Sequence, residues 1–191
     1  MTDTTALTPG EIAKIAARID RPVVLVGLMG VGKSTVGRRL AAMLGTDFVD
    51  VDDEIERAAD RTVSEIFEAH GEAYFRSGER RVIARLMEEA HGVIATGGGA
   101  FVDPETRALI LDQAIAVWLD CDIDTLVERT SRRNDRPLLR NGNARKARVR
   151  SAGEPRRQRR HVHLIPGPGG KALRADLLCR RHALQQRIGC L

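Results

Sequence analysis

The stretch GLMGVGKST, residues 27–35, decides the fold, and it follows directly on the apolar run RPVVLV of residues 21–26. Its glycines, lysine and serine satisfy every position of the phosphate-loop pattern, between a predicted buried strand and a predicted helix. Backbone N–H groups at such glycines can turn toward phosphate oxygens, Lys33 adds a positive charge, and Ser34 offers a hydroxyl to Mg²⁺. The stretch therefore predicts a site for a nucleoside triphosphate with Mg²⁺, and it leaves the phosphate acceptor open.

Short apolar runs alternate with amphipathic segments along the chain. Strands are predicted over residues 21–28, 46–53, 92–99 and 114–119, and helices over 34–44, 62–69, 74–90, 103–113 and 122–130. This alternation indicates a parallel sheet with helices on both faces, and such sheets bind ligands at the carboxyl ends of their strands. We expect a short helical extension within residues 1–20 and the main domain over residues 21–191.

Composition and cysteine usage narrow the class of protein. With 191 residues, of which 42% are hydrophobic, the chain can build one domain with its own core. No apolar run approaches the ~18 residues that span a bilayer, and the N-terminus lacks the apolar segment of a secretory signal. The cysteines, Cys121, Cys179 and Cys190, show neither paired nor metal-binding spacing. We therefore expect a cytoplasmic protein with no membrane span.

The charge is distributed unevenly along the chain. Residues 144–191 contain 11 Arg and 2 Lys against one Glu and one Asp, a net charge of +11. Because the whole chain carries +5, residues 1–143 carry −6. The change near residue 144 is the main compositional boundary of the sequence.

Three further groups follow the predicted strands and helices and suggest the acceptor. Asp50 and Asp52 alternate in a predicted strand, so both side chains should point the same way, one toward Mg²⁺ through water and one toward a hydroxyl. Arg76 and Glu79 lie three residues apart on one predicted helix face, where the carboxylate can orient an arginine that binds an acid. The glycines of residues 97–99 would admit a ligand against bare backbone. Taken singly, these groups also fit a solvated acidic turn, a surface ion pair and a plain turn.

Together these groups indicate a small acceptor that carries a carboxylate and hydroxyl groups. Such an acceptor has to be shielded from water during phosphoryl transfer, because ATP is otherwise hydrolysed. The charged, proline-broken segment SRRNDRPLLRNGN, residues 131–143, is predicted to be a loop that closes over the site as a lid.

Five motifs, GLMGVGKST, DVD, FRSGE, GGGA and RPLL, occur in an order and spacing that closely resemble shikimate kinase, over about residues 21–143. The resemblance implies phosphorylation of the 3-hydroxyl of shikimate by ATP, in aromatic amino-acid biosynthesis. It also implies a three-layer α/β P-loop fold similar to nucleoside-monophosphate kinases. Such a fold has a five-stranded parallel sheet of order 2-3-1-4-5 and a mobile lid. The expected substrates are ATP and shikimate, and the expected state is a monomer.

The resemblance also assigns roles to individual residues. It implies that ATP is bound by Gly30, Val31, Gly32, Lys33, Ser34, Thr35, Arg129 and Arg136, and Mg²⁺ by Ser34 and Asp50. It implies that shikimate is bound by Asp52, Arg76, Gly97, Gly98 and Gly99. Lys33 and Arg136 would neutralise charge on the transferred phosphoryl group, and Asp52 would align the reacting hydroxyl and take its proton.

The segment after the lid departs from the family pattern. Gly153 stands where the family has a second arginine for the shikimate carboxylate, and Arg157 where it has a tyrosine two residues after a proline. Either the tail has diverged or its reading frame has changed. One back-translation of residues 156–161, CGC CGA CAG CGC CGA CAC, gives Ala-Asp-Ser-Ala-Asp when shifted by one base, which resembles the acidic stretch of relatives. Residues 171–188 keep near-helical apolar spacing and are predicted to form a helix. We expect this tail to weaken activity.

Two other functions were weighed against this interpretation. Another small-molecule kinase of the same fold, such as a gluconate kinase, would share the phosphate loop but would not be expected to share DVD, FRSGE and GGGA together. A nucleic-acid-binding protein would use the run RRQRRH of residues 156–161, but its only support is charge, without aromatic residues on which bases could stack.

Overall fold

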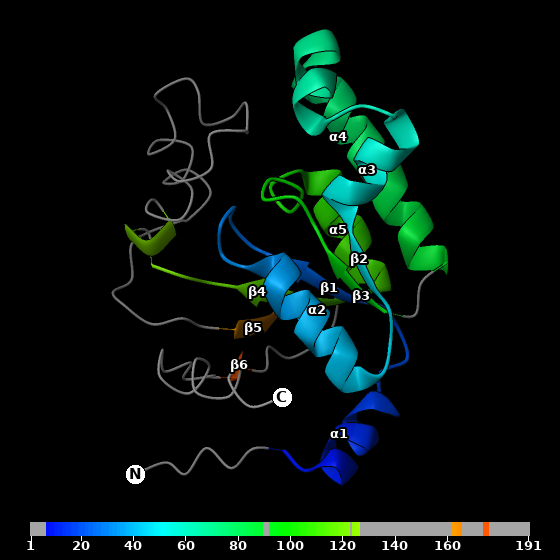
Figure 1. The fold of residues 1–191 in the computed structure, drawn as a ribbon, viewed down its shortest axis with the longest axis vertical. Helices are drawn as coiled ribbons and strands as arrows, with labels where there is room; N and C mark the ends of the chain where they lie inside the picture. The colour runs from blue at the N-terminus through cyan, green and yellow to red at the C-terminus, as the bar shows by residue number, and fades with distance from the viewer. Residues whose placement is uncertain (1–6, 90–91, 123, 127–161, 166–173, 176–191) are drawn as a thin grey trace.

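The computed structural model describes residues 7–89, 92–122, 124–126, 162–165 and 174–175 (Figure 1). In chain order its elements are α1 (Pro9–Ala16), β1 (Val23–Val26), α2 (Lys33–Leu44), β2 (Phe48–Asp50), α3 (Val51–Ala59), α4 (Val63–Glu89), β3 (Val93–Ala95), α5 (Pro104–Gln113), β4 (Ile115–Leu119), β5 (Val162–Ile165) and β6 (Arg174–Ala175). The predicted alternation of strands and helices is confirmed up to β4, except that helix α3 was not predicted.

The first four strands form a parallel sheet of order β2-β3-β1-β4. Strand β1 is central, and all four of its residues are buried. Its register sets Val23 opposite both Val93 of β3 and Ile115 of β4. The predicted order 2-3-1-4 is therefore confirmed, and each of the four strands points its carboxyl end to the same edge of the sheet.

The fifth strand lies beside β4 as predicted, but it runs antiparallel rather than parallel. Leu119, the last residue of β4, pairs with Val162, the first residue of β5. The chain thus enters β5 at the carboxyl edge of β4, and from that edge only an antiparallel direction carries it along its neighbour. Strand β6 then pairs antiparallel with β5, so the helix predicted over residues 171–188 is wrong at residues 174–175, which form the last strand of the sheet.

Helices cover both faces of the parallel sheet, which confirms the three-layer architecture (Figure 1). Alternate residues of β1 point to opposite faces, as the pleat of a strand requires. Val24 and Val26 pack in the larger core, together with buried residues of α3, α4 and α5. Val23 and Leu25 pack in the smaller core with Ala41 of α2. The sheet is therefore an apolar platform from which polar side chains project only at its ends.

Local signals set the ends of most helices. Thr62 and Glu65 form a reciprocal capping box at the start of the helix predicted from residue 62, with Thr62 N donating to Glu65 Oε2 at 2.8 Å and Glu65 N donating to Thr62 Oγ1 at 3.2 Å. Asp103 caps α5, as predicted. The two helices predicted over 62–69 and 74–90 join into α4 across a kink at Gly71, whose φ of 79° and ψ of 177° suit glycine alone. Asp122 accepts from Thr125 N at 2.8 Å, which confirms the start of the next predicted helix, while its end lies outside the described residues.

Helix α1 confirms that the segment before β1 contains a short helix, and its N-terminus is capped by Thr8. No helix in the described part of the chain is both long and apolar enough to cross a membrane.

Candidate active site

The phosphate-loop residues lie between the carboxyl end of β1 and the first turn of α2, as predicted. Lys33 is 8% exposed, and its Nζ donates to Gly27 O at 2.8 Å and to Leu28 O at 3.0 Å. Gly32 is the N-cap of α2 and has a left-handed conformation, so the helix starts with N–H groups that no side chain caps. The loop is thus folded around the lysine, and the positive end of the α2 dipole faces the place where phosphates would lie.

The two aspartates lie close together, but not in the predicted way. The strand predicted over 46–53 ends at Asp50, and Asp52 already belongs to the first turn of α3. Asp50 is the N-cap of that helix and accepts from Asp52 N at 3.2 Å. The prediction that an extended chain aligns the two side chains is wrong, because an aspartate favours a helix start over a longer strand.

Ser34 and Asp50 present two oxygen atoms side by side at the phosphate loop. Ser34 Oγ donates to Asp50 Oδ2 at 2.6 Å, across the gap between α2 and the end of β2. Magnesium binds hard oxygen ligands and keeps several waters, so one hydroxyl and one carboxylate suffice beside the phosphates of a nucleotide. Within the described ranges no cluster of three or more acidic, histidine or cysteine side chains forms a metal site. The donor set fits Mg²⁺ held jointly with a nucleotide.

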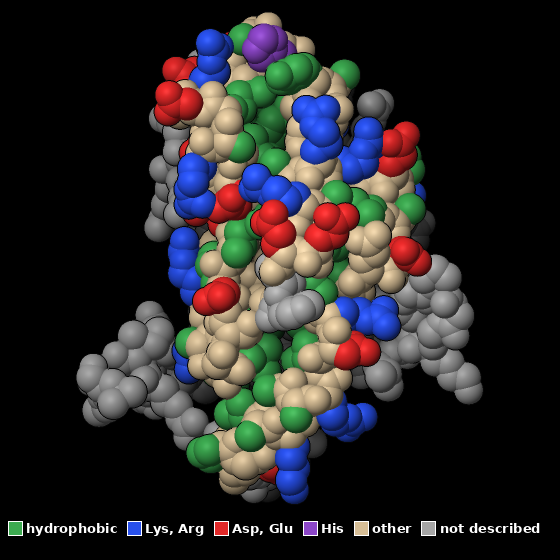
Figure 2. All heavy atoms as spheres, turned by 90° about the vertical axis from the view of Figure 1, so that its right-hand side faces the viewer, with side chains coloured by type: hydrophobic (Ala, Val, Ile, Leu, Met, Phe, Trp, Pro, Cys, Tyr) green, Lys and Arg blue, Asp and Glu red, His purple; other side chains and the backbone are tan. Residues whose placement is uncertain are grey.

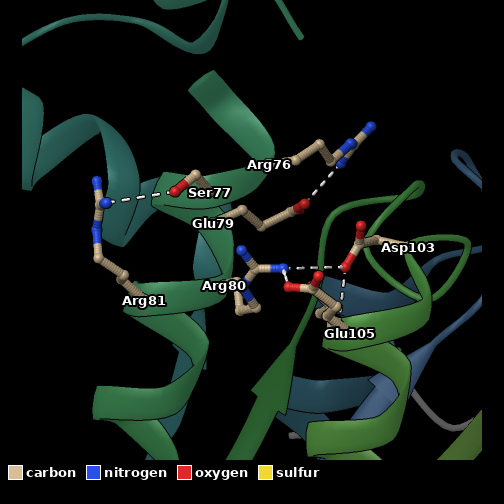
Figure 3. Close-up of polar contacts among 8 residues, drawn as sticks. Arg76, Ser77, Glu79, Arg80, Arg81, Asp103 and Glu105 are labelled. Atoms are coloured by element: carbon tan, nitrogen blue, oxygen red, sulfur yellow. Dashed lines mark hydrogen bonds and ion pairs between the residues drawn. The ribbon is translucent and has the colours of Figure 1, made fainter. Parts of the chain in front are cut away.

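Arg76 is held in place by two carboxylates of its own helix, and Figure 3 shows the contact with one of them, Glu79. Arg76 Nη1 donates to Glu79 Oε2 at 2.6 Å, and Nη2 donates to Glu72 Oε1 at 3.3 Å. Glu79 is completely buried, whereas the side chain of Glu72 is largely exposed. The predicted orienting role of Glu79 agrees with this contact. Glu72 was missed, although its position four residues before the arginine is a detectable signal.

Burial and charge act in opposite directions on this pair. Burial raises the pKa of Glu79, the Arg76 guanidinium lowers it in part, and the charges of Asp52 and Asp103 raise it further. Burial lowers the pKa of Arg76, but Glu79 and Glu72 more than offset this, so that its pKa rises above the ordinary value. Glu79 Oε1 is buried and has no hydrogen-bond partner among the described residues. The arginine is therefore a fixed, permanently charged group beside a carboxylate with a free acceptor atom.

The glycine loop after β3 touches each of the other groups. A Cβ at Gly97 would lie 2.6 Å from Glu79 Oε1 and 3.1 Å from Asp52 Oδ1, and one at Gly99 would lie 2.4 Å from Arg76 Nη2. A Cβ at Gly98 would lie 2.8 Å from the backbone nitrogen of Met29, in the phosphate loop. The backbone of Met29 thus leaves no room for a side chain at Gly98, whereas at Gly97 and Gly99 the nearest atoms are the ends of the Glu79 and Arg76 side chains. The approach to Met29 was not predicted and left no signal in the sequence.

The described residues therefore form one site at the carboxyl edge of the sheet. The phosphate loop follows β1, the aspartates follow β2, the glycine loop follows β3, and Arg76 approaches from α4. The site thus brings together a phosphate cradle, a pair of oxygens that suit a metal ion and a partly buried arginine, whose side chain is 17% exposed. Arg129, Arg136 and the predicted lid of residues 131–143 lie outside the described residues.

Comparison with known proteins agrees with this arrangement. A family model described as shikimate kinase matches residues 29–164, which extends past residue 143, where the resemblance was predicted to end. A shikimate kinase of Novosphingobium aromaticivorans is 52% identical over 184 residues, 93% of this chain and 95% of the relative. A shikimate kinase of Caulobacter vibrioides is 61% identical over 120 residues, 63% of this chain and 60% of the relative.

Solved structures give the same result. Shikimate kinase from Acinetobacter baumannii, in complex with shikimate, is 39% identical with a TM-score of 0.66, over 73% of this chain and 76% of that one. Shikimate kinase from Bacteroides thetaiotaomicron is 34% identical with a TM-score of 0.59, over 63% of this chain and 69% of that one. These matches do not favour the gluconate kinase or the nucleic-acid-binding protein. The chain is a kinase, and it belongs to the shikimate kinase family.

Proposed function

We propose that this protein transfers the γ-phosphoryl group of ATP to the 3-hydroxyl of shikimate, with Mg²⁺ as cofactor. The observation that carries the proposal is the contact between the glycine loop and the acceptor groups. A Cβ added to residues 97–99 would contact Asp52, Arg76 and Met29 of the phosphate loop, so these groups border the same space, where a small acceptor would be bound. We also propose that the protein is a monomer and that it is cytoplasmic. The odd number of cysteines without paired spacing supports the cytoplasmic location, where thiols stay reduced.

On the nucleotide side, the phosphate loop binds ATP through the backbone N–H groups of residues 30–35, and Lys33 balances the phosphate charge. Ser34 and Asp50 would hold Mg²⁺, which when bound would supply positive charge beside the phosphates of the nucleotide. Arg129 and Arg136, assigned from the family resemblance, would add positive charge near the adenine and the phosphates.

On the acceptor side, Arg76 binds the carboxylate of shikimate and Asp52 binds its hydroxyls. Glu79 is a positioning residue, since its bond to Arg76 Nη1 fixes the plane of the guanidinium while other N–H groups remain for the substrate. Asp52 orients the 3-hydroxyl toward the γ-phosphorus and accepts its proton as the new O–P bond forms, while the bond from the γ-phosphorus to the β–γ bridging oxygen breaks and ADP leaves. The protein's contribution is therefore mainly alignment and charge neutralisation.

The proposal predicts a clear order of acceptors in an assay that couples ADP release to NADH oxidation. With ATP and Mg²⁺, shikimate should be phosphorylated faster than quinate, and quinate faster than gluconate, since only shikimate offers the family's carboxylate and hydroxyl pattern to Arg76 and Asp52. The phosphorylated position should be checked by ³¹P–¹H NMR. Faster turnover of gluconate than of shikimate would contradict the proposal.

Replacing Arg76 by lysine should weaken shikimate binding more than tenfold, about 1.4 kcal/mol, because an ammonium group cannot form the bidentate contact of a guanidinium. ATP affinity should be unchanged, since Arg76 lies on the acceptor side of the site. Isothermal titration with each substrate measures both effects. The matched control is Arg39→Lys on the exposed side of α2, which should change neither affinity. An equal loss of both affinities for Arg76→Lys would show a structural role instead.

We also propose that residues 144–191 limit the activity of this chain. Support comes from Gly153, which stands where the family pattern has a second arginine for the substrate carboxylate. One missing charge-assisted contact in a closed site costs about 2–4 kcal/mol, because the substrate carboxylate is then only half paired.

A chimera tests this proposal. Replacing residues 144–191 by the tail of a family member that contains the arginine should raise kcat/KM for shikimate by about 30-fold or more. As a control, the same exchange with that arginine changed to glycine should give no increase. Equal kcat/KM for the original chain and the chimera would show that the tail is harmless. Sequencing the DNA across codons 140–191 would separately decide whether the reading frame is intact.

A further inference from the structure

A second concave site lies between α3 and α4, on the side of α4 opposite the candidate active site. It has a volume of about 500 Å³, within the ~300–1,000 Å³ of small-molecule pockets. Its floor is formed by the buried core residues Ile55, Ile66 and Phe75. Figure 2 shows hydrophobic side chains gathered between the two helices on this face, with basic side chains around them. We call this site the α3/α4 groove.

The charge of the α3/α4 groove is of one sign. Arg61, Arg81 and Arg85 line it, and no acidic residue of the described part of the chain does. Arg85 is partly balanced, since it pairs with Glu54 at 3.2 Å and with Glu89 at 3.9 Å. Arg81 donates to the uncharged Ser77 Oγ at 3.3 Å and forms no ion pair among the described residues. An anion at the mouth of the groove would therefore meet positive charge that the protein itself does not neutralise.

Aromatic rings gather in the same place. The chain has only four Phe, one Tyr and one Trp, yet Tyr74 and Phe75 both line the groove. The rings of His70 and Tyr74 are 4.5 Å apart, and Tyr74 is 54% exposed at the rim. An apolar floor with exposed rings suits a planar aromatic body, which can stack on them as it buries its faces.

Gly78 leaves space in the groove, although a glycine at this position does not stabilise helix α4. Gly78 lines the groove in the middle of α4, where glycine costs about 0.5–1 kcal/mol relative to alanine. Its φ is not positive, and a Cβ built on it would meet nothing within 4 Å. Neither the backbone conformation nor the packing requires glycine at this position. The absence of a side chain at Gly78 therefore serves to leave the groove open.

We propose that the α3/α4 groove is a binding site for a small aromatic anion, with the ring body on the apolar floor and the acidic group toward Arg81 and Arg61. The site is separate from the substrate site, because Arg76 and Arg81 project from opposite sides of α4 (Figure 3). The aromatic anion and the substrates should therefore bind independently of one another.

The test uses the full chain and the fluorescent probe 1-anilinonaphthalene-8-sulfonate, an aromatic anion. The wild-type chain should bind it saturably, and saturating ATP with shikimate should not displace it. Gly78→Leu, which fills the groove, should weaken binding by about tenfold or more, and Arg81→Gln by about threefold or more. The uncharged N-phenyl-1-naphthylamine should bind more weakly than the sulfonate and should not respond to Arg81→Gln.

Matched controls carry the same chemical changes elsewhere. Gly10→Leu adds the same side chain to an open helical position in α1, and Arg39→Gln removes the same charge from α2. Neither should alter probe binding. Gly78→Leu should melt at or above the wild-type temperature, which circular dichroism can verify, because leucine favours a helix more than glycine. Equal affinity of Gly78→Leu and the wild type would overturn the proposal, as would displacement by the substrates or equal binding of the uncharged probe.

Discussion

The Lys33→Met variant is expected to lose about a thousandfold in kcat for shikimate phosphorylation, which corresponds to about 4 kcal/mol of transition-state stabilisation. Methionine has nearly the shape of lysine, so the change removes a charge from the phosphate loop without opening a cavity. Lys33 is buried and bonded to the carbonyls of Gly27 and Leu28, which places its ammonium group inside the loop that holds the phosphates. Charge that develops on the transferred group would then lack its nearest fixed cation.

Steady-state kinetics with both substrates measures this effect. The KM for shikimate should change little, because Lys33 lies on the nucleotide side, and the loss should appear in kcat. Lys14→Met is the matched control, since Lys14 is exposed on α1, and it should retain full activity. A Lys33→Met chain that keeps more than about a tenth of its kcat would show that the lysine serves only to fold the loop.

The Asp52→Asn variant should also lose about a thousandfold in kcat, within the ~10²–10⁴-fold typical of a lost general base. Asparagine keeps the size and the hydrogen-bonding reach of the side chain, but it cannot accept the proton of the attacking hydroxyl. The first turn of α3 holds this side chain beside Gly97, where the acceptor would lie. Shikimate affinity should fall much less than kcat, because the amide still bonds to hydroxyls.

Thermal unfolding separates this catalytic effect from a loss of structure. The negative charge of Asp52 raises the pKa of the buried Glu79, so the two carboxylates repel one another in the folded protein. Removing that charge should leave the melting temperature unchanged or raise it, although activity is lost. Asp53→Asn, on the exposed side of the same helical turn, is the control and should keep its activity. A lower melting temperature for Asp52→Asn, with activity lost in proportion, would show that Asp52 acts through the fold.

The parallel part of the fold could be predicted because its signals are local. Residues 23–26 have no polar side chain to expose, so they predicted a buried strand. The helices predicted from residues 62 and 103 begin at the capping residues Thr62 and Asp103, whose partners lie only three residues away. The site followed from the same logic, since strands that run in parallel bring their carboxyl ends to one edge. Arg76 and Glu79 could be paired because three residues is nearly one helical turn.

The parts that were wrong or missed depend on contacts between distant segments. Whether Asp52 continues a strand or starts a helix is decided by the side chain of Asp50, which can form a cap only when the chain turns there. The antiparallel direction of β5 depends on where the chain returns to the sheet after residue 126. The pattern of apolar residues in the sequence carries no information about that point of return. The approach of Gly98 to Met29 joins two loops 69 residues apart, and only the packed structure brings them into contact.

The central position of β1 also sets the order in which the chain can fold. Val23 pairs with Val93 on one side and with Ile115 on the other, residues that follow it by 70 and 92 positions. During synthesis the apolar run of β1 leaves the ribosome long before either neighbour exists, and parallel pairing over such distances is slow because large loops have to close first. We expect refolding to be slower than for a helical domain of equal length, and association between unfolded chains to begin at residues 23–26. Strand β1, which positions the phosphate loop in the folded protein, is thus the segment that most needs protection from association with other chains during synthesis.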